Sequence, residues 1–425
     1  MAARRKLASH TLPTLLRSAA WCAAGLIGAG LAACADAPAP RSAAYAPAAD
    51  GRRLDVPAVT ALGRALFFEP SLSASGRTSC ATCHDPRRAY GPPNDLSVQF
   101  AGRDGGTPGL RAVPSLRYLN TLPAFTEHFF DNDGDDSIDA GPTGGLMWDG
   151  RADSAREQAR LPLLSDAEMA NASVAEAVAR LRAGPLAARF REVFGAAVLD
   201  HDTTAFERLL FALEVFQQSP REFYPFSSRY DEVLRGRAQL GEREARGLAL
   251  FNDPAKGNCA SCHPSERRPD GAFPLFTDFG LIAIGVPRNR TLPANADPTF
   301  FDLGLCGPLR SDLAHRDDYC GRFRTPTLRN AALRGSFFHN GGMHSLRDVL
   351  RFYSRRDTDP HEFYPRAADG RVDKFDDLPP RLRGNVDAEP PFDRKPGDAP
   401  ALSDDEIADV IEFLRTLTDA ELASP

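Results

Sequence analysis

The sequence lacks the features of two common classes of protein. It has no cluster of basic residues, and its formal charge is −6, falling to −10 without residues 1–33, which hold four basic residues and no acidic one. An acidic chain without a basic patch argues against a nucleic-acid partner. Alternation of polar and apolar residues is also scarce, so few strands are expected.

No good membrane span is present either. The apolar stretch "WCAAGLIGAGLAA" is too short and too rich in Ala and Gly to cross a bilayer. It follows basic residues at positions 4–6, and residues 1–33 are therefore expected to be an export signal. The motif "LAAC" resembles a bacterial lipobox, in which Cys34 is lipidated; ordinary cleavage near 33–35 is the alternative. Residues 34–52, rich in Pro and Ala, predict a flexible tether. We expect a periplasmic protein that touches a membrane only through this lipid.

The cysteines identify the cofactor. Two C-x-x-C-H motifs occur, Cys80, Cys83 and His84 in the first and Cys259, Cys262 and His263 in the second. In this motif the thiols bond the vinyl groups of haem c and the histidine is the proximal iron ligand. A redox dithiol is the alternative, but it does not require a histidine at the same place twice. The sequence therefore predicts two covalently attached haems c.

Two further cysteines remain, Cys306 and Cys320. In an oxidising compartment they favour a disulfide, whose loop closure is worth roughly 3 kcal/mol. Two free thiols are the alternative, because the sequence does not give the geometry.

The haem motifs lie in a weak internal repeat. Residues 62–86 and 245–266 each run from a helical pattern ending in Leu-Phe, through a polar turn, into a C-x-x-C-H motif. Each half closes on an amphipathic helix, at 204–218 and at 403–417, the second with a capping box of Ser403 and Glu406.

This repeat predicts a mainly α fold of two cytochrome c-like domains, each with one haem. The N-terminal domain is expected at 53–228 and the C-terminal domain at 229–425, with a linker near 220–237. The 35 prolines and 34 glycines predict long irregular loops.

Residues 146–170, "LMWDGRADSAREQARLPLLSDAEMA", resemble the bacterial dihaem cytochrome c peroxidase and MauG family. In that family W-D-G-R-A, E-Q-A, a proline and E-M follow the first haem in this order, and the resemblance extends from about 57 to 418. It implies an N-terminal peroxidatic domain and a C-terminal electron-transfer domain. The catalytic residues it implies are Trp148, bridging the haems, Gln158 and Glu168, above the first haem, and Pro162, in the wall of that pocket.

These residue types suit the cleavage of hydrogen peroxide. Splitting hydrogen peroxide requires a proton to move from its inner to its outer oxygen, which a carboxylate and an amide above an open iron can assist. An indole can relay an electron. Without haems, Trp148 would be a core residue and Glu168 a helix cap or surface residue.

The first haem departs from the ordinary peroxidases, which carry a plugging histidine after a short S-I-G-like segment. Here that place is taken by Phe100, in "LSVQFAG", and phenylalanine cannot bind iron. The nearest histidine, His128, lies in an extra segment and is more often structural. The prediction is a five-coordinate first haem held by His84 alone, as in MauG.

Tyr353 is the expected distal ligand of the second haem. Ser345 is a good N-cap, so a helix should begin near Leu346, and Tyr353 then falls on its buried stripe. A packed core tyrosine is the alternative. The family places the second distal ligand fourteen positions after a histidine that corresponds to His339, as methionine in ordinary peroxidases and tyrosine in MauG. Met343 and His344 are the other candidate ligands.

A tyrosine ligand changes the expected chemistry. A phenolate is a hard, anionic donor that favours ferric and ferryl iron, whereas a thioether favours ferrous iron. The resemblance to MauG implies that two oxidising equivalents are shared across both haems, as a bis-ferryl state.

Two secondary sites are weaker. Asp131, Asp133 and Asp135 stand at alternating positions of a calcium loop, but Asp136 replaces its turn glycine, and a solvated acidic loop is the alternative. The asparagine of the family's inter-haem calcium site is Ala112 here, which puts that site in doubt. Arg324 and Arg329 lie in the family's stretch beside the second haem, to neutralise propionates or to form surface salt bridges.

Together these features predict an exported dihaem enzyme that reduces hydrogen peroxide. Its electrons would come from a small cytochrome or copper protein, or from a protein substrate oxidised at a tryptophan. A dihaem electron carrier without peroxide chemistry is the alternative.

Overall fold

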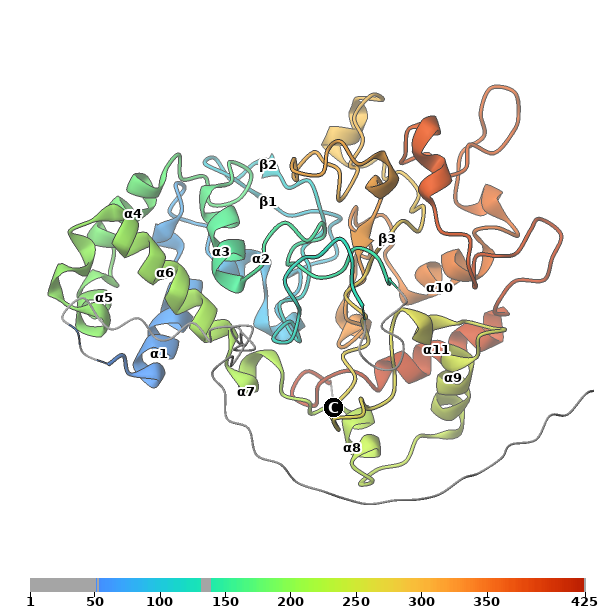
Figure 1. Ribbon diagram of the computed structural model, residues 1–425, viewed down its shortest axis with the longest axis horizontal. Coiled ribbons are helices and arrows are strands. Elements are labelled where there is room, and N and C mark those ends of the chain that lie inside the picture. Colours follow the sequence, from blue (N-terminus) through green and yellow to red (C-terminus); the bar gives the residue numbers. More distant parts are fainter. Residues whose placement is uncertain (1–50, 52, 131–138, 424–425) are drawn as a thin grey trace, which may run out of the picture. The chain divides into compact units, whose positions relative to one another are not determined.

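The computed structural model describes residue 51 and residues 53–130 and 139–423. Helices are the main regular structure and long loops join them, as expected (Figure 1). The helices are α1 (Val56–Phe67), α2 (Cys80–Cys83), α3 (Ala155–Leu164), α4 (Val174–Ala183), α5 (Ala187–Phe194), α6 (Asp202–Gln217), α7 (Pro220–Phe223), α8 (Arg229–Leu234), α9 (Glu242–Asn252), α10 (Leu346–Arg355) and α11 (Asp404–Arg415). The strands form two antiparallel pairs, β1 (Phe100–Ala101) with β2 (Thr107–Pro108) and β3 (Leu281–Ile282) with β4 (Phe323–Arg324).

Several expectations concern other residues. The export signal, Cys34 and the calcium-loop residues Asp131, Asp133 and Asp135 lie outside the described residues, as does nearly all of the tether. Within the described ranges, no helix is long and apolar enough to cross a membrane.

A helix pair frames the first haem motif. The carboxylate of Asp55 accepts a hydrogen bond from the N–H of Ala58 and caps α1. α1 packs closely on α6 because Gly63 faces it: a Cβ at Gly63 would lie 1.9 Å from the carbonyl oxygen of Ala212. The apolar stripe predicted for this closing helix is buried in α6.

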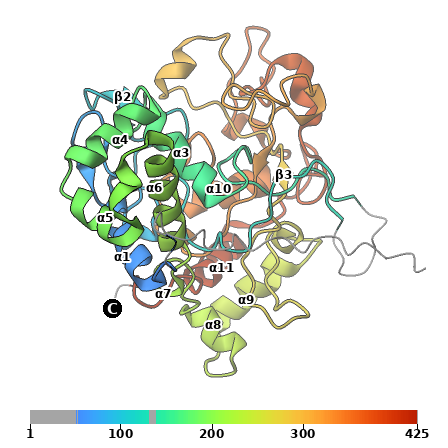
Figure 2. The same cartoon turned by 60° about the vertical axis from the view of Figure 1, so that its left-hand side comes forward.

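The second half repeats this arrangement. The capping box of Ser403 and Glu406 is confirmed at the start of α11, and α9 packs against α11 through Gly247. A Cβ at Gly247 would lie 2.1 Å from the carbonyl oxygen of Asp409. Figure 2 shows α9 beside α11 from a second direction. The sequence repeat is thus a structural one, with the same glycine contact before each haem motif.

Each half also has its own hydrophobic core. The main cluster of the first half lies between Leu54 and Tyr224, and that of the second half lies between Tyr230 and Leu417 beside two smaller clusters. All of these residues belong to one compact unit, and the domain boundaries at 53–228 and 229–425 remain a prediction.

The segment near 220–237, expected to be a linker, lies where the first cluster ends and the second begins. It contains α7 and α8, and its side chains belong to the cores: the ring of Phe223 stacks on Tyr90 at 4.4 Å, and Tyr230 packs on Phe413 at 5.3 Å. Ser228 and Asp231 form a capping box at the start of α8. The segment is ordered by these contacts, which its local sequence pattern does not reveal.

The expected disulfide is present. Cys306 and Cys320 are bonded, with their Cα atoms 5.0 Å apart, and both are buried beside Leu382. The bridge ties a long loop of the second half to itself.

The glycine contacts give a prediction about stability. Gly247→Ala should lower the free energy of unfolding by about 1–3 kcal/mol, because the new methyl group would push α9 away from the backbone of α11. Chemical denaturation of the holoprotein measures this. Gly384→Ala is the control, since nothing lies within 4 Å of a Cβ there. Equal stabilities of the two variants would contradict the prediction.

Candidate functional site

The two motif histidines have the same local geometry. Nδ1 of His84 lies 2.9 Å from the carbonyl oxygen of Tyr90, and Nδ1 of His263 lies 2.7 Å from that of Phe276. An Nδ1–H that donates to a carbonyl leaves Nε2 unprotonated and able to bind a metal. Burial lowers the pKa of both imidazoles to about 4, so both rings are neutral at pH 7.

The carbonyl acceptors are held by an unusual backbone conformation. Tyr90 and Phe276 are fully buried, and each has a φ of 54°. A non-glycine residue in this left-handed region costs about 1–3 kcal/mol and persists only where packing enforces it. The same strained conformation in both halves indicates that the orientation of each histidine is under constraint.

The four motif cysteines are unpaired thiols. Burial raises the pKa of Cys80, Cys83 and Cys259 to about 12 and that of Cys262 to about 11. They are therefore neutral at pH 7, beside histidines with a free Nε2. This donor set, repeated twice, fits two covalently attached haems c.

A cavity of about 570 Å³ adjoins the second motif. Cys259, Cys262 and His263 line it together with apolar and aromatic side chains. Three side-chain atoms that are buried without a hydrogen-bond partner belong to residues of its wall: Nη1 of Arg324, Oγ1 of Thr325 and Nε2 of His339. An apolar cavity with unpartnered polar groups suits a flat apolar ring with anionic substituents.

Tyr353 lies on the wall of this cavity. Ser345 caps α10 by accepting a hydrogen bond from the N–H of Asp348, so the helix begins at Leu346 as predicted. The expected stripe of α10, which ends at Tyr353, lines the cavity as well. Burial raises the pKa of Tyr353 above its ordinary value, so its phenolate form requires a cation in the cavity.

The other candidate ligands of the second haem are placed differently. Nδ1 of the exposed His344 lies 2.8 Å from the carbonyl oxygen of Gly335. Met343 pairs with Phe337 in an isolated bridge. His339 lines the cavity, and its ring stacks on Phe323 at 3.5 Å.

Trp148 lies where the two halves meet. Its indole lines the cavity of the second half, and its Nε1–H donates to the carbonyl oxygen of Ala112 at 2.7 Å. The N–H of Arg324 donates to the carbonyl oxygen of Trp148 at 2.8 Å. Contacts with both halves place the indole suitably for a bridge.

Glu168 lies near the first motif. Burial, followed by the charge of Glu168, raises the pKa of Cys83. Burial also raises the pKa of Glu168 itself above its ordinary value. Gln158 is on α3, with its Nε2 3.5 Å from the sulfur of Met147, and Pro162 lies inside the same helix. The region of the first motif thus contains a carboxyl group that binds protons more readily than usual.

Two residues expected to distinguish the first haem lie at the surface. Phe100, on β1, is 49% exposed. His128 is exposed and forms an ion pair with Asp139. His128 therefore has a surface partner, as expected for a structural residue.

Arg324, which is buried, and Arg334, which is half-buried, have no carboxylate hydrogen-bond partner among the described residues. Burial lowers the pKa of each to about 10. Arg324 donates from Nε to the carbonyl oxygen of Met147, and Arg334 donates to those of Ser336 and Val113. Both line the cavity. Sequence reasoning missed Arg334, which stands in no recognised motif.

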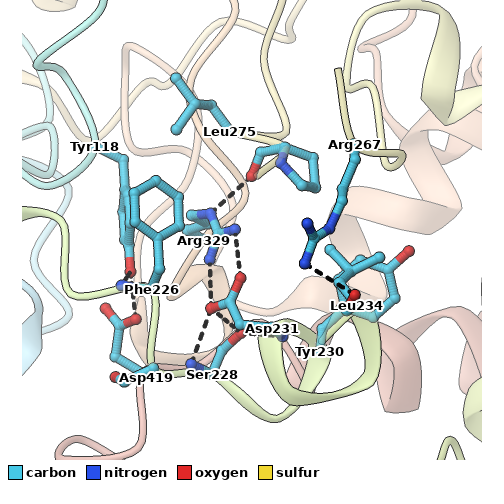
Figure 3. Close-up of polar contacts among 12 residues, drawn as sticks. Tyr118, Phe226, Ser228, Tyr230, Asp231, Leu234, Arg267, Leu275, Arg329 and Asp419 are labelled. Atoms are coloured by element: carbon cyan, nitrogen blue, oxygen red, sulfur yellow. Dashed lines mark hydrogen bonds and ion pairs between the residues drawn. The ribbon is translucent and has the colours of Figure 1, made fainter. Parts of the chain in front are cut away.

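The expectation for Arg329 requires a correction. Its guanidinium is fully buried and donates to both carboxylate oxygens of Asp231, at 2.8 and 3.0 Å (Figure 3). It also lies 4.7 Å from the ring centroids of Tyr118 and Phe226. Arg329 therefore forms a buried ion pair with Asp231 instead of a surface salt bridge, and it also lines the cavity.

These sites define a class: a c-type cytochrome with two haem motifs and a tryptophan between its halves. The model of the di-haem cytochrome c peroxidase family matches residues 57–239. The methylamine utilization protein MauG of Paracoccus denitrificans is 36% identical over 305 residues, which cover 70% of this chain and 74% of that protein.

Solved structures of similar proteins agree with this family assignment. The diheme peroxidase BthA of Burkholderia thailandensis is 43% identical, with a TM-score of 0.76, over 87% of this chain and 88% of that chain. A MauG-like protein associated with microbial copper homeostasis is 28% identical, with a TM-score of 0.58, over 87% and 91%. The chain belongs to the dihaem cytochrome c peroxidase and MauG family, and membership implies two c-type haems.

The pair of Arg329 and Asp231 gives a prediction about stability. Asp231→Asn should cost about 3–5 kcal/mol, because it leaves the buried guanidinium without a counter-charge. Denaturation of the holoprotein at pH 7 measures this. Asp317→Asn is the control, since its partner Arg381 is exposed and such pairs contribute at most about 1 kcal/mol.

The contribution of the Arg329–Asp231 pair to stability depends on pH in a defined direction. Burial alone would raise the pKa of Asp231, but Arg329 outweighs it and lowers that pKa below its ordinary value. The pair therefore stabilises the fold above about pH 4 and loses this effect as the pH falls further, towards the folded-state pKa. A wild-type protein no more stable than Asp231→Asn at pH 7 would contradict this assignment.

Proposed function

We propose that this chain is an exported dihaem peroxidase of the MauG-like type. Hydrogen peroxide is reduced at the haem attached to Cys80 and Cys83 and bound by His84. Electrons come from a protein partner through Trp148 and the haem bound by His263 and Tyr353. The observation that carries the proposal is the carboxyl group of Glu168, which has a raised pKa and lies beside the first motif, in a chain of this family.

A haem c held by Cys80, Cys83 and His84 would supply an iron for cleaving the oxygen–oxygen bond of hydrogen peroxide. Glu168 accepts the proton of the inner peroxide oxygen on its carboxylate and returns it to the outer oxygen, which leaves as water. The raised pKa of Glu168 suits the first step, because its carboxylate is a stronger base than that of an ordinary carboxyl group. Gln158 orients peroxide with its amide, and Pro162 closes the wall beside it.

Trp148 is the proposed route for electrons. Its indole borders the cavity of the second half, and its backbone is tied to Arg324 in that cavity wall. Arg324, with Arg334, would hold the propionates of the second haem, because both are cations that line the cavity without a carboxylate partner.

A dihaem electron carrier without peroxide chemistry is the second candidate. It predicts a sixth ligand on each iron. The surface position of Phe100 and the ion pair of His128 offer no histidine for the first iron, and a carrier has no use for Glu168 beside the first motif.

The partner and location follow from the same family. The donor is a small cytochrome or copper protein, or a protein substrate is oxidised at a tryptophan, as the tyrosine at position 353 favours. We place the protein in the periplasm, anchored by a lipid on Cys34. Calcium on Asp131, Asp133 and Asp135 stays a secondary proposal.

Peroxide titration of the ferric protein tests the function. The wild type should show a high-spin signal that peroxide removes before any reduction, together with a near-infrared charge-resonance band. Glu168→Gln should slow this reaction by about 10²–10⁴-fold, because its amide cannot accept the proton. In the wild type the rate should fall as the pH drops through the raised pKa of Glu168, since the protonated acid cannot accept a proton. Low-spin iron alone, unreactive with peroxide until reduced, would support the electron carrier.

Tyr353→Phe tests the second ligand. The variant should lose the tyrosinate-type low-spin signal, because phenylalanine has no oxygen donor. Electronic absorption and electron paramagnetic resonance spectra of the ferric protein measure this. Tyr364→Phe is the control, since the hydroxyl of Tyr364 donates to the carbonyl oxygen of Gly285 instead. An unchanged spectrum of Tyr353→Phe would rule out the assignment.

A further inference from the structure

Arg111 is a buried cation shared by two carboxylates. Its side chain is 6% exposed. Nε and Nη2 donate to the two carboxylate oxygens of Asp302, each at 2.7 Å, and Nη1 donates to Asp149 at 2.7 Å. Asp149 and Asp302 are buried as well, and they come from different halves of the chain.

This ion-pair network is directly attached to Trp148. Ala112, which follows Arg111, accepts the hydrogen bond of the indole N–H, and Asp149 follows Trp148. The segment 111–112 is therefore joined to the segment 148–149 at two points, through the indole and through the ion pair. The ion pair thus fixes the position of the two segments that the indole hydrogen bond joins.

The same network reaches the cavity of the second half. Asp302 lines that cavity, and the N–H of Ala112 donates to the carbonyl oxygen of His339 at 2.7 Å. The guanidinium of Arg111 lies 5.4 Å from the ring centroid of Phe323, which stacks on His339. Arg111 thus connects the indole with the opposite wall of the cavity.

The charge of Asp302 requires this cation, because Arg111 is its ion-pair partner, whereas Asp149 also pairs with Arg151 at 2.7 Å. Two buried carboxylates would repel each other without a counter-charge between them. Burial alone would lower the pKa of Arg111, but Asp302 and Asp149 raise it above its ordinary value, and the pKa of Asp302 is lowered in turn. The rigid fork of a guanidinium can bind both carboxylates at once, which the single ammonium group of lysine cannot do as well.

We propose that Arg111 is the positioning residue of the Trp148 bridge. Its guanidinium is an internal cation that takes the place of a bound divalent metal ion at the junction of the two halves. The inference rests on the proposed electron route through Trp148. It implies that the bridge works without added metal.

The experiment compares Arg111→Met, Arg111→Lys and Arg117→Met with the wild type, all as dihaem proteins. Arg117 is the matched control: it is as buried as Arg111 and also joins the two halves, but its partners are Asp419 and Glu421. Each protein is treated with peroxide in the ferric state, with and without a chelator. The readouts are the loss of the high-spin signal, which reports the first haem, and the near-infrared charge-resonance band, which reports coupling through Trp148.

Arg111→Met should still lose its high-spin signal when peroxide is added. Its near-infrared band should be at least about tenfold weaker than that of the wild type. Arg111→Lys should restore part of the band, Arg117→Met should keep it, and the wild type should keep it in chelator. An intact band in Arg111→Met, or a wild-type band abolished by chelator, would overturn the proposal.

A second variant keeps the test independent of the electron route. Arg111→Gly leaves Asp302 without its counter-charge and Asp149 with Arg151 alone, and the freed carboxylate oxygens can bind Ca²⁺. Its thermal unfolding midpoint should rise with millimolar CaCl₂, whereas that of the wild type should not change.

The two proposals can fail separately. A wild type that gives no near-infrared band would overturn the proposed route through Trp148. A midpoint of Arg111→Gly indifferent to Ca²⁺, or a wild-type midpoint that depends on it, would overturn the role of Arg111 as internal cation.

Discussion

Each motif histidine lies with Nδ1 within hydrogen-bond distance of a backbone carbonyl, that of Tyr90 in the first half and of Phe276 in the second. The direction of Nε2, and hence the face on which a haem iron would bind, depends on this one contact. The carbonyls are themselves fixed by a left-handed backbone inside a packed aromatic cluster in each half. The helix pairs that close on Gly63 and Gly247 therefore also support the geometry of the metal ligands.

The two halves share the contact between the motif histidine and a backbone carbonyl, but they differ in the other residues that lie near each motif. The first motif has the proton-retaining Glu168 beside it, whereas the second faces a cavity whose wall carries the phenol of Tyr353. In the proposed function this difference assigns proton transfer to the first half and storage of an oxidising equivalent to the second. Trp148 belongs to the chain of the first half, yet its indole borders the cavity of the second.

Local features of the structure could be predicted from the sequence, because the determining residues are close together in the chain. The cap at Ser345 and the helical stripe leading to Tyr353 are of this kind, and so is the capping box of α11. The haem motifs and the order of the family motifs likewise identified the family before any geometry was known.

Contacts between distant residues could not be predicted in this way. Arg329 pairs with Asp231, 98 positions away, and Arg111 with Asp302, 191 positions away. Neither pairing leaves a periodic pattern in the sequence, so neither could be predicted from it. The hydrogen bond from the indole N–H of Trp148 to the carbonyl oxygen of Ala112 affects what happens to the indole proton. A backbone carbonyl is far too weak a base to take the indole proton, so an indole that gives up an electron to the first half keeps its N–H. In the proposed electron route, the next electron then restores the same molecule without a proton from solvent, and transfer through Trp148 is reversible and insensitive to solvent deuterium.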